Sequence, residues 1–141
     1  MDGAVTDLDN SIIYKWGALA HCYPWRPERA PCLAELSDCL YERSRKTCSS
    51  KDLEEAIAVG SEALELRPSG HPDRLSSLRK LVRCFIYLFQ RGPISPVNLE
   101  AAITLGQEAL NLYSLGHPDR SSCVHALACF LFERFQKGGS S

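Results

Sequence analysis

Three residues in the C-terminal part of the chain carry the side chains best suited to chemistry. His125 and Cys129 lie four residues apart, which places them on one face of a helix, and Cys123 lies close by. A thiol beside an imidazole could act as a nucleophile with its base, or the three could hold part of a zinc site. Zinc needs a fourth ligand, and the chain has no Cys-x-x-Cys pair. We therefore expect buried thiols beside a histidine, with no metal and no catalytic residue.

Two further histidines lie in a segment that occurs twice. The run from Gly70 to Arg74 reads Gly-His-Pro-Asp-Arg, and it recurs unchanged from Gly116 to Arg120. An active site has to occur only once, whereas a structural joint must occur in every unit. Proline is favoured at the first helical position and aspartate in the first turn. The repetition therefore predicts that His71 and His117 cap helices.

The repeated segment shows that the chain consists of repeats. Pro72 lies 72 − 27 = 45 residues after Pro27 of a worn third copy, and Pro118 lies 118 − 72 = 46 residues after Pro72. Residues 52–91 and 98–137 are identical at 18 of 40 aligned positions. A constant spacing of this size is typical of stacked supersecondary units. We expect three units, at about residues 7–51, 52–97 and 98–141.

Each unit is expected to be a helical hairpin. In the second unit, Asp52 with Glu55 forms a capping-box pattern, and apolar residues then recur with helical spacing. Asn98 takes the place of Asp52 in the third unit, where Val124, Leu127, Ala128, Leu131 and Phe135 make the second apolar stripe. The expected helices cover residues 7–21, 28–45, 52–66, 72–91, 98–112 and 118–136.

Two segments of the second unit resemble the tetratricopeptide repeat. Residues 52–57 and 62–68 are similar to the second helix of that repeat, with Ala56, Ala63 and Pro68 at its spacing. The His-Pro-Asp opening resembles the longer kinesin-light-chain type, as found in long fungal arrays. The resemblance covers about residues 7–137. It implies an all-α, right-handed solenoid of three hairpins, although these units exceed the usual length of about 34 residues.

The resemblance also implies that the chain is part of a longer array. In the family register it starts on a second helix and ends on a first helix. Ser140-Ser141 lies 45 + 46 = 91 residues after Ser49-Ser50, the pair that introduces the helix at Asp52. A helix at the end of the array would expose part of the apolar run from Ala126 to Phe132. We therefore expect self-association through the terminal helices.

In this family the first helices of successive units line a concave groove. The resemblance places nine side chains there, and Arg79 and Arg83, one helical turn apart, could both bind a carboxylate of a peptide. Pairing of these arginines with Asp38 or Glu42 of the preceding unit is the structural alternative. The predicted groove residues are Asp38, Tyr41, Glu42, Arg79, Arg83, Ile86, Tyr87, His125 and Phe132.

Composition excludes several classes of function. The net charge is −1, so no overall field favours nucleic acid or an anionic membrane. The longest apolar runs are far shorter than the roughly 20 residues that span a bilayer. Gly138-Gly139 lacks the Lys-Ser/Thr of a phosphate-binding loop, so no cofactor is expected. Trp16 and Trp25 flank the worn turn, and we expect them in the core.

Together these features predict a non-catalytic cytoplasmic scaffold that binds a peptide or helix of a partner protein. Seven cysteines in irregular spacing fit reduced thiols in the cytosol. One alternative is a sensor or regulatory segment of a larger protein that carries a caspase-like or nucleotide-binding domain. A remote alternative, from a different class, is a Cys/His-dependent enzyme or metal protein.

Overall fold

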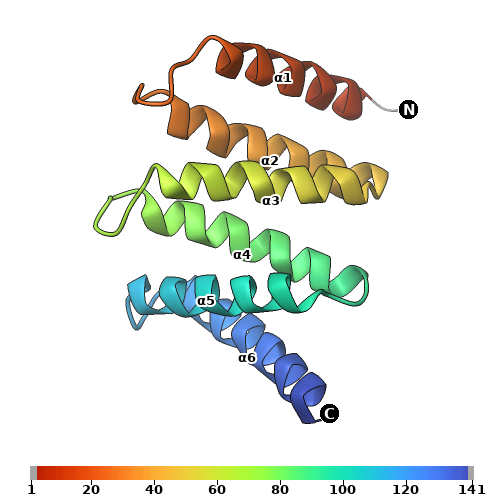
Figure 1. Cartoon of the computed structure of the whole chain (residues 1–141), viewed down its shortest axis with the longest axis vertical. Helices are drawn as coiled ribbons and strands as arrows, with labels where there is room; N and C mark the ends of the chain where they lie inside the picture. The colour runs from red at the N-terminus through yellow and green to blue at the C-terminus, as the bar shows by residue number, and fades with distance from the viewer. Residues whose placement is uncertain (1–2, 140–141) are drawn as a thin grey trace. The chain divides into compact units, whose positions relative to one another are not determined.

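Helices joined by turns and loops make up residues 3–139, the part of the chain that the computed structural model describes (Figure 1). Helices cover about four-fifths of the described residues, and no strand occurs among them. The six helices are α1 (Gly3–Ala20), α2 (Arg29–Thr47), α3 (Ser50–Glu65), α4 (Arg74–Arg91), α5 (Pro96–Leu112) and α6 (Pro118–Gly139). Each of the six expected helices is therefore confirmed, within a few residues at its ends. The Ser140-Ser141 pair lies outside the described residues.

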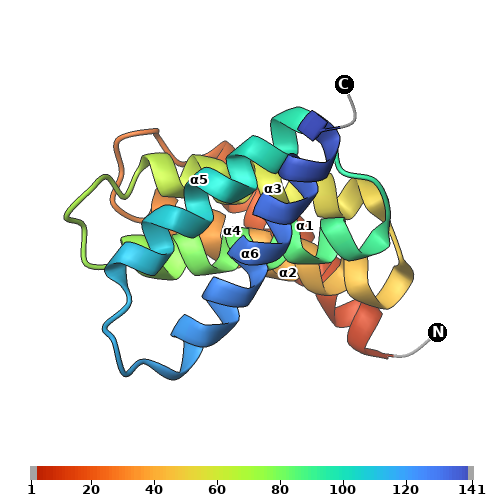
Figure 2. The ribbon, with the colours of Figure 1, turned by 90° about the horizontal axis from the view of Figure 1, so that it is seen from below.

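The chain divides into two compact units, Met1–Lys80 and Leu81–Ser141, so that α4 contributes to both. In the first unit α2 packs against α1 on one side and α3 on the other. In the second unit α5 crosses α6, and a turn joins them at one end (Figure 2). The core of the first unit contains Leu33, Leu36 and Leu40 of α2 and Leu53 and Ala56 of α3.

The caps of α3 and α5 differ from those expected. Ser49, and not Asp52, caps α3, because its hydroxyl accepts a hydrogen bond from the Asp52 amide at 3.1 Å. Ser95 caps α5 in the same way by accepting from the Asn98 amide at 3.2 Å. Both helices therefore begin before the predicted residue, since a serine hydroxyl three residues upstream satisfies the amide.

The two copies of the Gly-His-Pro-Asp-Arg segment share the hydrogen bond made by their histidine, although Gly70 has a positive φ and Gly116 does not. The imidazole Nδ1 of His71 accepts a hydrogen bond from the Asp73 amide at 3.0 Å, and His117 does the same with Asp119 at 3.0 Å. Gly70 has a φ of 92°, which a residue with a side chain rarely adopts. The predicted capping role of both histidines is confirmed.

The arginine of each turn binds the end of the preceding helix. Nη1 of Arg74 donates to the Arg67 carbonyl at 2.7 Å, and Nη1 of Arg120 donates to the equivalent Tyr113 carbonyl at 3.2 Å and to the Leu110 carbonyl at 2.8 Å. Arg29 of the worn turn keeps this contact with the Cys22 carbonyl at 3.3 Å. A guanidinium at a helix C-terminus satisfies carbonyls that have no partner in the helix. The arginine is thus the feature that all three turns share.

The two tryptophans are not in the core, contrary to expectation. Trp25 is 75% exposed and Trp16 is 44% exposed. The ring of Trp25 stacks on Tyr23, with centroids 4.8 Å apart and planes within 8° of parallel. The worn turn carries Tyr23 and Trp25 on the surface, where each ring covers one face of the other.

Candidate functional site

A hollow of about 500 Å³ lies in the second unit, between the C-terminal half of α4 and the N-terminal half of α6. Its members combine apolar and aromatic side chains with a few polar ones, as is usual for binding pockets. Its lining residues are Ile86, Phe89, Gln90, Ser121, Ser122, His125, Ala126, Cys129 and Phe130. We call this hollow the α4–α6 pocket.

The contacts of α5 fix the position of α6 beside the pocket. A Cβ atom added at Gly106 would lie 3.3 Å from Cδ1 of Leu127, so the glycine permits close approach of the two helices. The Cys123 thiol donates to the Gly106 carbonyl, with 3.5 Å between Sγ and oxygen. Burial raises the pKa of Cys123, which keeps it a neutral thiol. Cys123 therefore holds α6 on α5 and does not face the pocket.

The base of the pocket is apolar and its rim is polar. Phe130 is almost fully buried, and its ring meets the edge of Phe89 with centroids 5.7 Å apart. Ala126 is also buried, whereas Gln90, Ser121 and His125 are exposed. Such a pocket can take an apolar side chain on its base while amide, hydroxyl and imidazole groups bind polar atoms at its edge.

The pocket contains the one thiol–imidazole pair that the sequence singled out. Sγ of Cys129 lies 3.8 Å from Nε2 of His125. Among residues 3–139, the His125 ring makes no other hydrogen bond that would orient it as a base. The described residues contain no group of three His, Cys, Asp or Glu side chains placed to hold a metal ion. The geometry thus gives a polar contact at the pocket rim, without the third group that a nucleophile–base pair requires.

Cys32 and Cys39 of α2 are poor nucleophiles because they are partly buried. Burial raises the pKa of Cys32 and of Cys39, although the neighbouring Lys15 acts in the opposite direction. A raised pKa reduces the fraction of thiolate, which is the reactive form. None of the seven cysteines forms a disulfide bond.

The predicted groove residues divide between the two units. Ile86 and His125 come together in the α4–α6 pocket, while Phe132 is 60% exposed and is not among its lining residues. Tyr87 contacts Arg91, whose guanidinium lies 5.6 Å from its ring centroid. Arg83 is half-buried in the same unit.

The other predicted residues lie in the first unit. Asp38 pairs with Lys80 at 2.9 Å, and Tyr41 is buried, with Arg45 above its ring. Glu42 lines a separate hollow between α1 and α2. Arg79 is exposed on α4. A single groove that joins these residues to the α4–α6 pocket stays a prediction.

Sequence reasoning missed most of the pocket. It singled out Cys129 for its chemistry but did not place Phe89, Gln90, Ser122 or Phe130 there. The available signal was the helical register: positions 122, 126 and 129 follow one face of α6, and positions 86, 89 and 90 follow one face of α4.

Comparison with known proteins gives no match: no family model fits the sequence, and no curated protein or solved structure is similar to it. The described residues also contain no helix with the length and hydropathy needed to cross a bilayer. The function must therefore be argued from the residues and their geometry alone.

Proposed function

We propose that the protein is a cytoplasmic, non-catalytic scaffold of the tetratricopeptide type, which binds a peptide or helix of a partner protein. The observation that carries this proposal is the α4–α6 pocket. It lies between the first helices of two successive repeats, where the family resemblance places the binding groove. An apolar base with a polar rim suits one anchoring side chain of a bound segment.

The repeated turns support the solenoid arrangement. All three hairpins use an arginine to bind the carbonyls at the end of the preceding helix, at equivalent positions 45 and 46 residues apart (74 − 29 and 120 − 74). Hairpins closed by an equivalent contact are what an array of repeated units would contain. Seven cysteines without a disulfide bond fit a reducing compartment.

Catalysis has less support than binding. The Cys129–His125 contact is long, and burial raises the pKa of Cys32, Cys39 and Cys123 away from the reactive form. We therefore assign no catalytic step to the protein. Retention of the fold with loss of a measured activity in Cys129→Ala would contradict this assignment.

The proposal can be tested with a random peptide library displayed on phage and selected on the immobilised wild-type chain. We expect selected peptides to share an apolar anchor residue, and Ser122→Trp to weaken them by about tenfold or more, which is about 1.4 kcal/mol. Ser122 is exposed and lines the pocket, so a large ring there blocks its mouth without disturbing the core. Binding is measured by calorimetry with the synthetic peptides.

Thr104→Trp provides the matched control. Thr104 is also an exposed hydroxyl residue on a helix of the same unit, but it lies outside the pocket. The selected peptides should bind it as they bind the wild type. Absence of any enriched peptide, or equal binding to Ser122→Trp, would overturn the assignment of the pocket. If the enriched peptides are acidic, Arg79→Glu with Arg83→Glu tests whether the predicted basic residues take part.

A further inference from the structure

The outer face of α6 consists of exposed residues whose equivalents in α2 are buried. The two helices correspond at a separation of 45 + 46 = 91 residues, as their equivalent arginines Arg29 and Arg120 show. In α2 the four positions are at most 7% exposed, whereas in α6 three of the four are 46%, 60% and 73% exposed and the alanine is also exposed. The pairs are Leu33 and Val124, Ser37 and Ala128, Tyr41 and Phe132, and Ser44 and Phe135.

Helix α3 packs against α2 on this side. The Ser37 hydroxyl donates to the Ala56 carbonyl at 2.7 Å, and the Ser44 hydroxyl donates to the Ser49 carbonyl at 3.0 Å, just before α3 begins. The positions that are exposed in α6 are thus those that a helix like α3 would cover. Three large apolar side chains on one helix face also form a patch that is costly to leave in water.

Helix α1 is the equivalent of α3 in the repeat, at a separation of 45 residues, because Asp7 corresponds to Asp52 (52 − 7 = 45). Three of the six positions at which α3 is buried are exposed in α1, and the other three are half-buried there. The pairs with an exposed residue in α1 are Asp52 and Asp7, Val59 and Tyr14, and Ala63 and Ala18. Tyr14 is 79% exposed and Ile13 beside it is 67% exposed. α1 therefore presents an uncovered face of the kind that α3 uses against α2.

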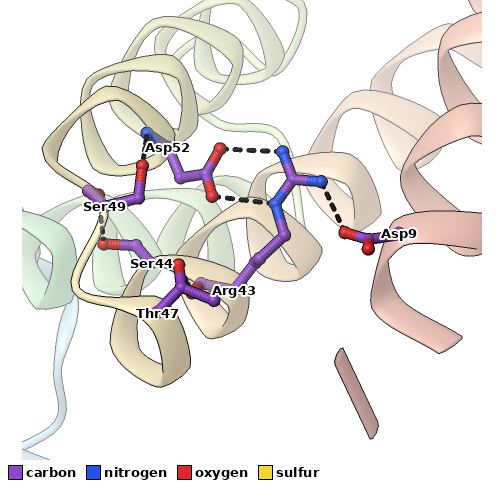
Figure 3. Close-up of polar contacts among 6 residues, drawn as sticks. All are labelled: Asp9, Arg43, Ser44, Thr47, Ser49 and Asp52. Carbon is purple, nitrogen blue, oxygen red and sulfur yellow. Dashed lines mark hydrogen bonds and ion pairs between the residues drawn. The ribbon is translucent and has the colours of Figure 1, made fainter. Parts of the chain in front are cut away.

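Charge also matches between these two faces. Arg43 of α2 binds Asp52 of α3 through Nε and Nη2, each at 2.8 Å, and Asp9 of α1 through Nη1 at 2.8 Å (Figure 3). Arg134 is the equivalent of Arg43 (43 + 91 = 134), and it binds Glu100, the equivalent of Asp9 (9 + 91 = 100), through Nη1 at 3.0 Å. Within residues 3–139 its Nε–Nη2 edge makes no hydrogen bond. Asp7 is the acidic residue that a docked α1 would bring to this edge.

We propose that the outer face of α6 binds α1 of a second copy of the chain, in the way that α2 binds α3. Phe132 and Phe135 contact the Tyr14 side of the incoming helix, Ala128 leaves room for its backbone, and Arg134 pairs with its Asp7. The two surfaces differ, so the contact is head-to-tail, and each added copy offers a fresh α6. The chain therefore forms open-ended oligomers whose size grows with concentration. This proposal is independent of the α4–α6 pocket.

Two variants, each blocking one surface, test the proposal by light scattering after size-exclusion chromatography. Phe135→Asp blocks the α6 face and leaves α1 intact, and Tyr14→Asp blocks the α1 face and leaves α6 intact. We expect the wild type to grow with concentration and each variant alone to be monomeric. An equimolar mixture should form a 1:1 dimer, because the intact α1 of Phe135→Asp can bind the intact α6 face of Tyr14→Asp. The dimer cannot extend, since its two remaining surfaces are both blocked.

Val97→Asp is the control, since Val97 is 79% exposed but lies on α5, outside both faces. It should associate like the wild type, and far-UV circular dichroism should show that all three variants keep their helices. A monomeric wild type at every concentration would overturn the proposal. Unchanged association of Tyr14→Asp would also overturn it. That result would show that α6 pairs with α6, or with a helix other than α1, of the second copy.

The charge pair can be tested in the same mixture. Asp7→Arg in the chain that supplies α1 should weaken the dimer several-fold, because it faces Arg134 with a like charge. Arg134→Asp in the chain that supplies α6 should restore part of the affinity when the two changes are combined. An equal loss in the combined pair would show that Arg134 and Asp7 do not meet.

Discussion

Helices α2 and α6 occupy the same place in two repeats, but within the described residues only α2 has a helix, α3, packed on its outer face. Arg43 of α2 connects three helices through Asp9 and Asp52, whereas Arg134 of α6 connects two through Glu100. Leu33 is 1% exposed and its equivalent Val124 is 46% exposed. The difference shows that the apolar pattern of a repeat indicates which residues of a helix can be buried. Whether they are buried depends on the presence of a neighbouring helix.

The opposite sides of the same two helices are alike. The Cys32 thiol of α2 donates to the Lys15 carbonyl of α1, with Sγ 3.8 Å from the oxygen. Its equivalent Cys123 of α6 donates to the Gly106 carbonyl of α5 at 3.5 Å, and 32 + 91 = 123 while 15 + 91 = 106. The hairpin contact is therefore conserved within the molecule, and the contrast is confined to the side that α3 covers in α2.

Truncation of an apolar residue on the covered side should give the largest effect. Leu33→Ala should lower the free energy of unfolding by about 3 kcal/mol, because it leaves a cavity in a packed core. Val124→Ala at the equivalent position should change it by about 0.5 kcal/mol or less. Urea denaturation at low protein concentration, where the chain is monomeric, measures both. Equal losses would mean that α6 is covered in the isolated chain.

Removal of the arginine should give an intermediate effect. Arg43→Met should cost about 2 kcal/mol, because it leaves Asp52, whose side chain is 10% exposed, without its bidentate partner. Burial opposes the charge on Arg43, but the carboxylates of Asp52 and Asp9 outweigh it and raise the pKa of the guanidinium, so the pair stays ionised. Arg134→Met should cost about 0.5 kcal/mol or less, since Arg134 and Glu100 are each about half exposed.

The same urea titrations measure the arginine variants, and Asp52→Asn separates the two contributions. If Arg43 acts mainly through Asp52, then the double variant Arg43→Met with Asp52→Asn should be more stable than Arg43→Met alone. The second change removes the carboxylate that Arg43→Met leaves without its partner. A loss in Arg134→Met as large as that in Arg43→Met would break the contrast between the two helices.

The sequence was sufficient to predict the helices because apolar spacing and the repeated turns act locally. The same spacing that placed a helix at residues 118–136 could not tell that Val124 and Phe135 would be exposed, since their burial depends on whether another helix packs on that face. The caps were misassigned because two polar residues competed at each helix start. Ser49 and Ser95 lie three residues before Asp52 and Asn98, so their hydroxyls reach those amides first.

The candidate site was harder to predict than the fold. Ile86 and His125 were placed in the groove by family register, and both line the α4–α6 pocket. The base of the pocket depends on how α4 and α6 approach each other, and Phe89 and Phe130 meet there from positions 41 residues apart (130 − 89). The exposure of Trp25 could not be predicted from its residue type. An aromatic residue in a turn can stack on a neighbouring ring instead of entering the core, and Trp25 stacks on Tyr23.

The smallest effect should come from the side on which the two helices agree. Burial raises the pKa of Cys32 and Cys123 above their ordinary value of 9.0. As pH rises above that value the thiols ionise in the unfolded chain before they do so in the folded one, so the unfolded state binds fewer protons and stability falls. Below pH 9.0 both states hold neutral thiols, and these groups add no pH dependence.

Urea titrations between about pH 8 and about pH 10 should therefore show a shallower decline of the free energy of unfolding in Cys32→Ala and in Cys123→Ala than in the wild type. The two variants should change the slope by similar amounts, because each thiol faces a carbonyl of the paired helix and not the α3 side. A change in only one of them would show that exposure of the outer face of α6 alters the hairpin contact as well.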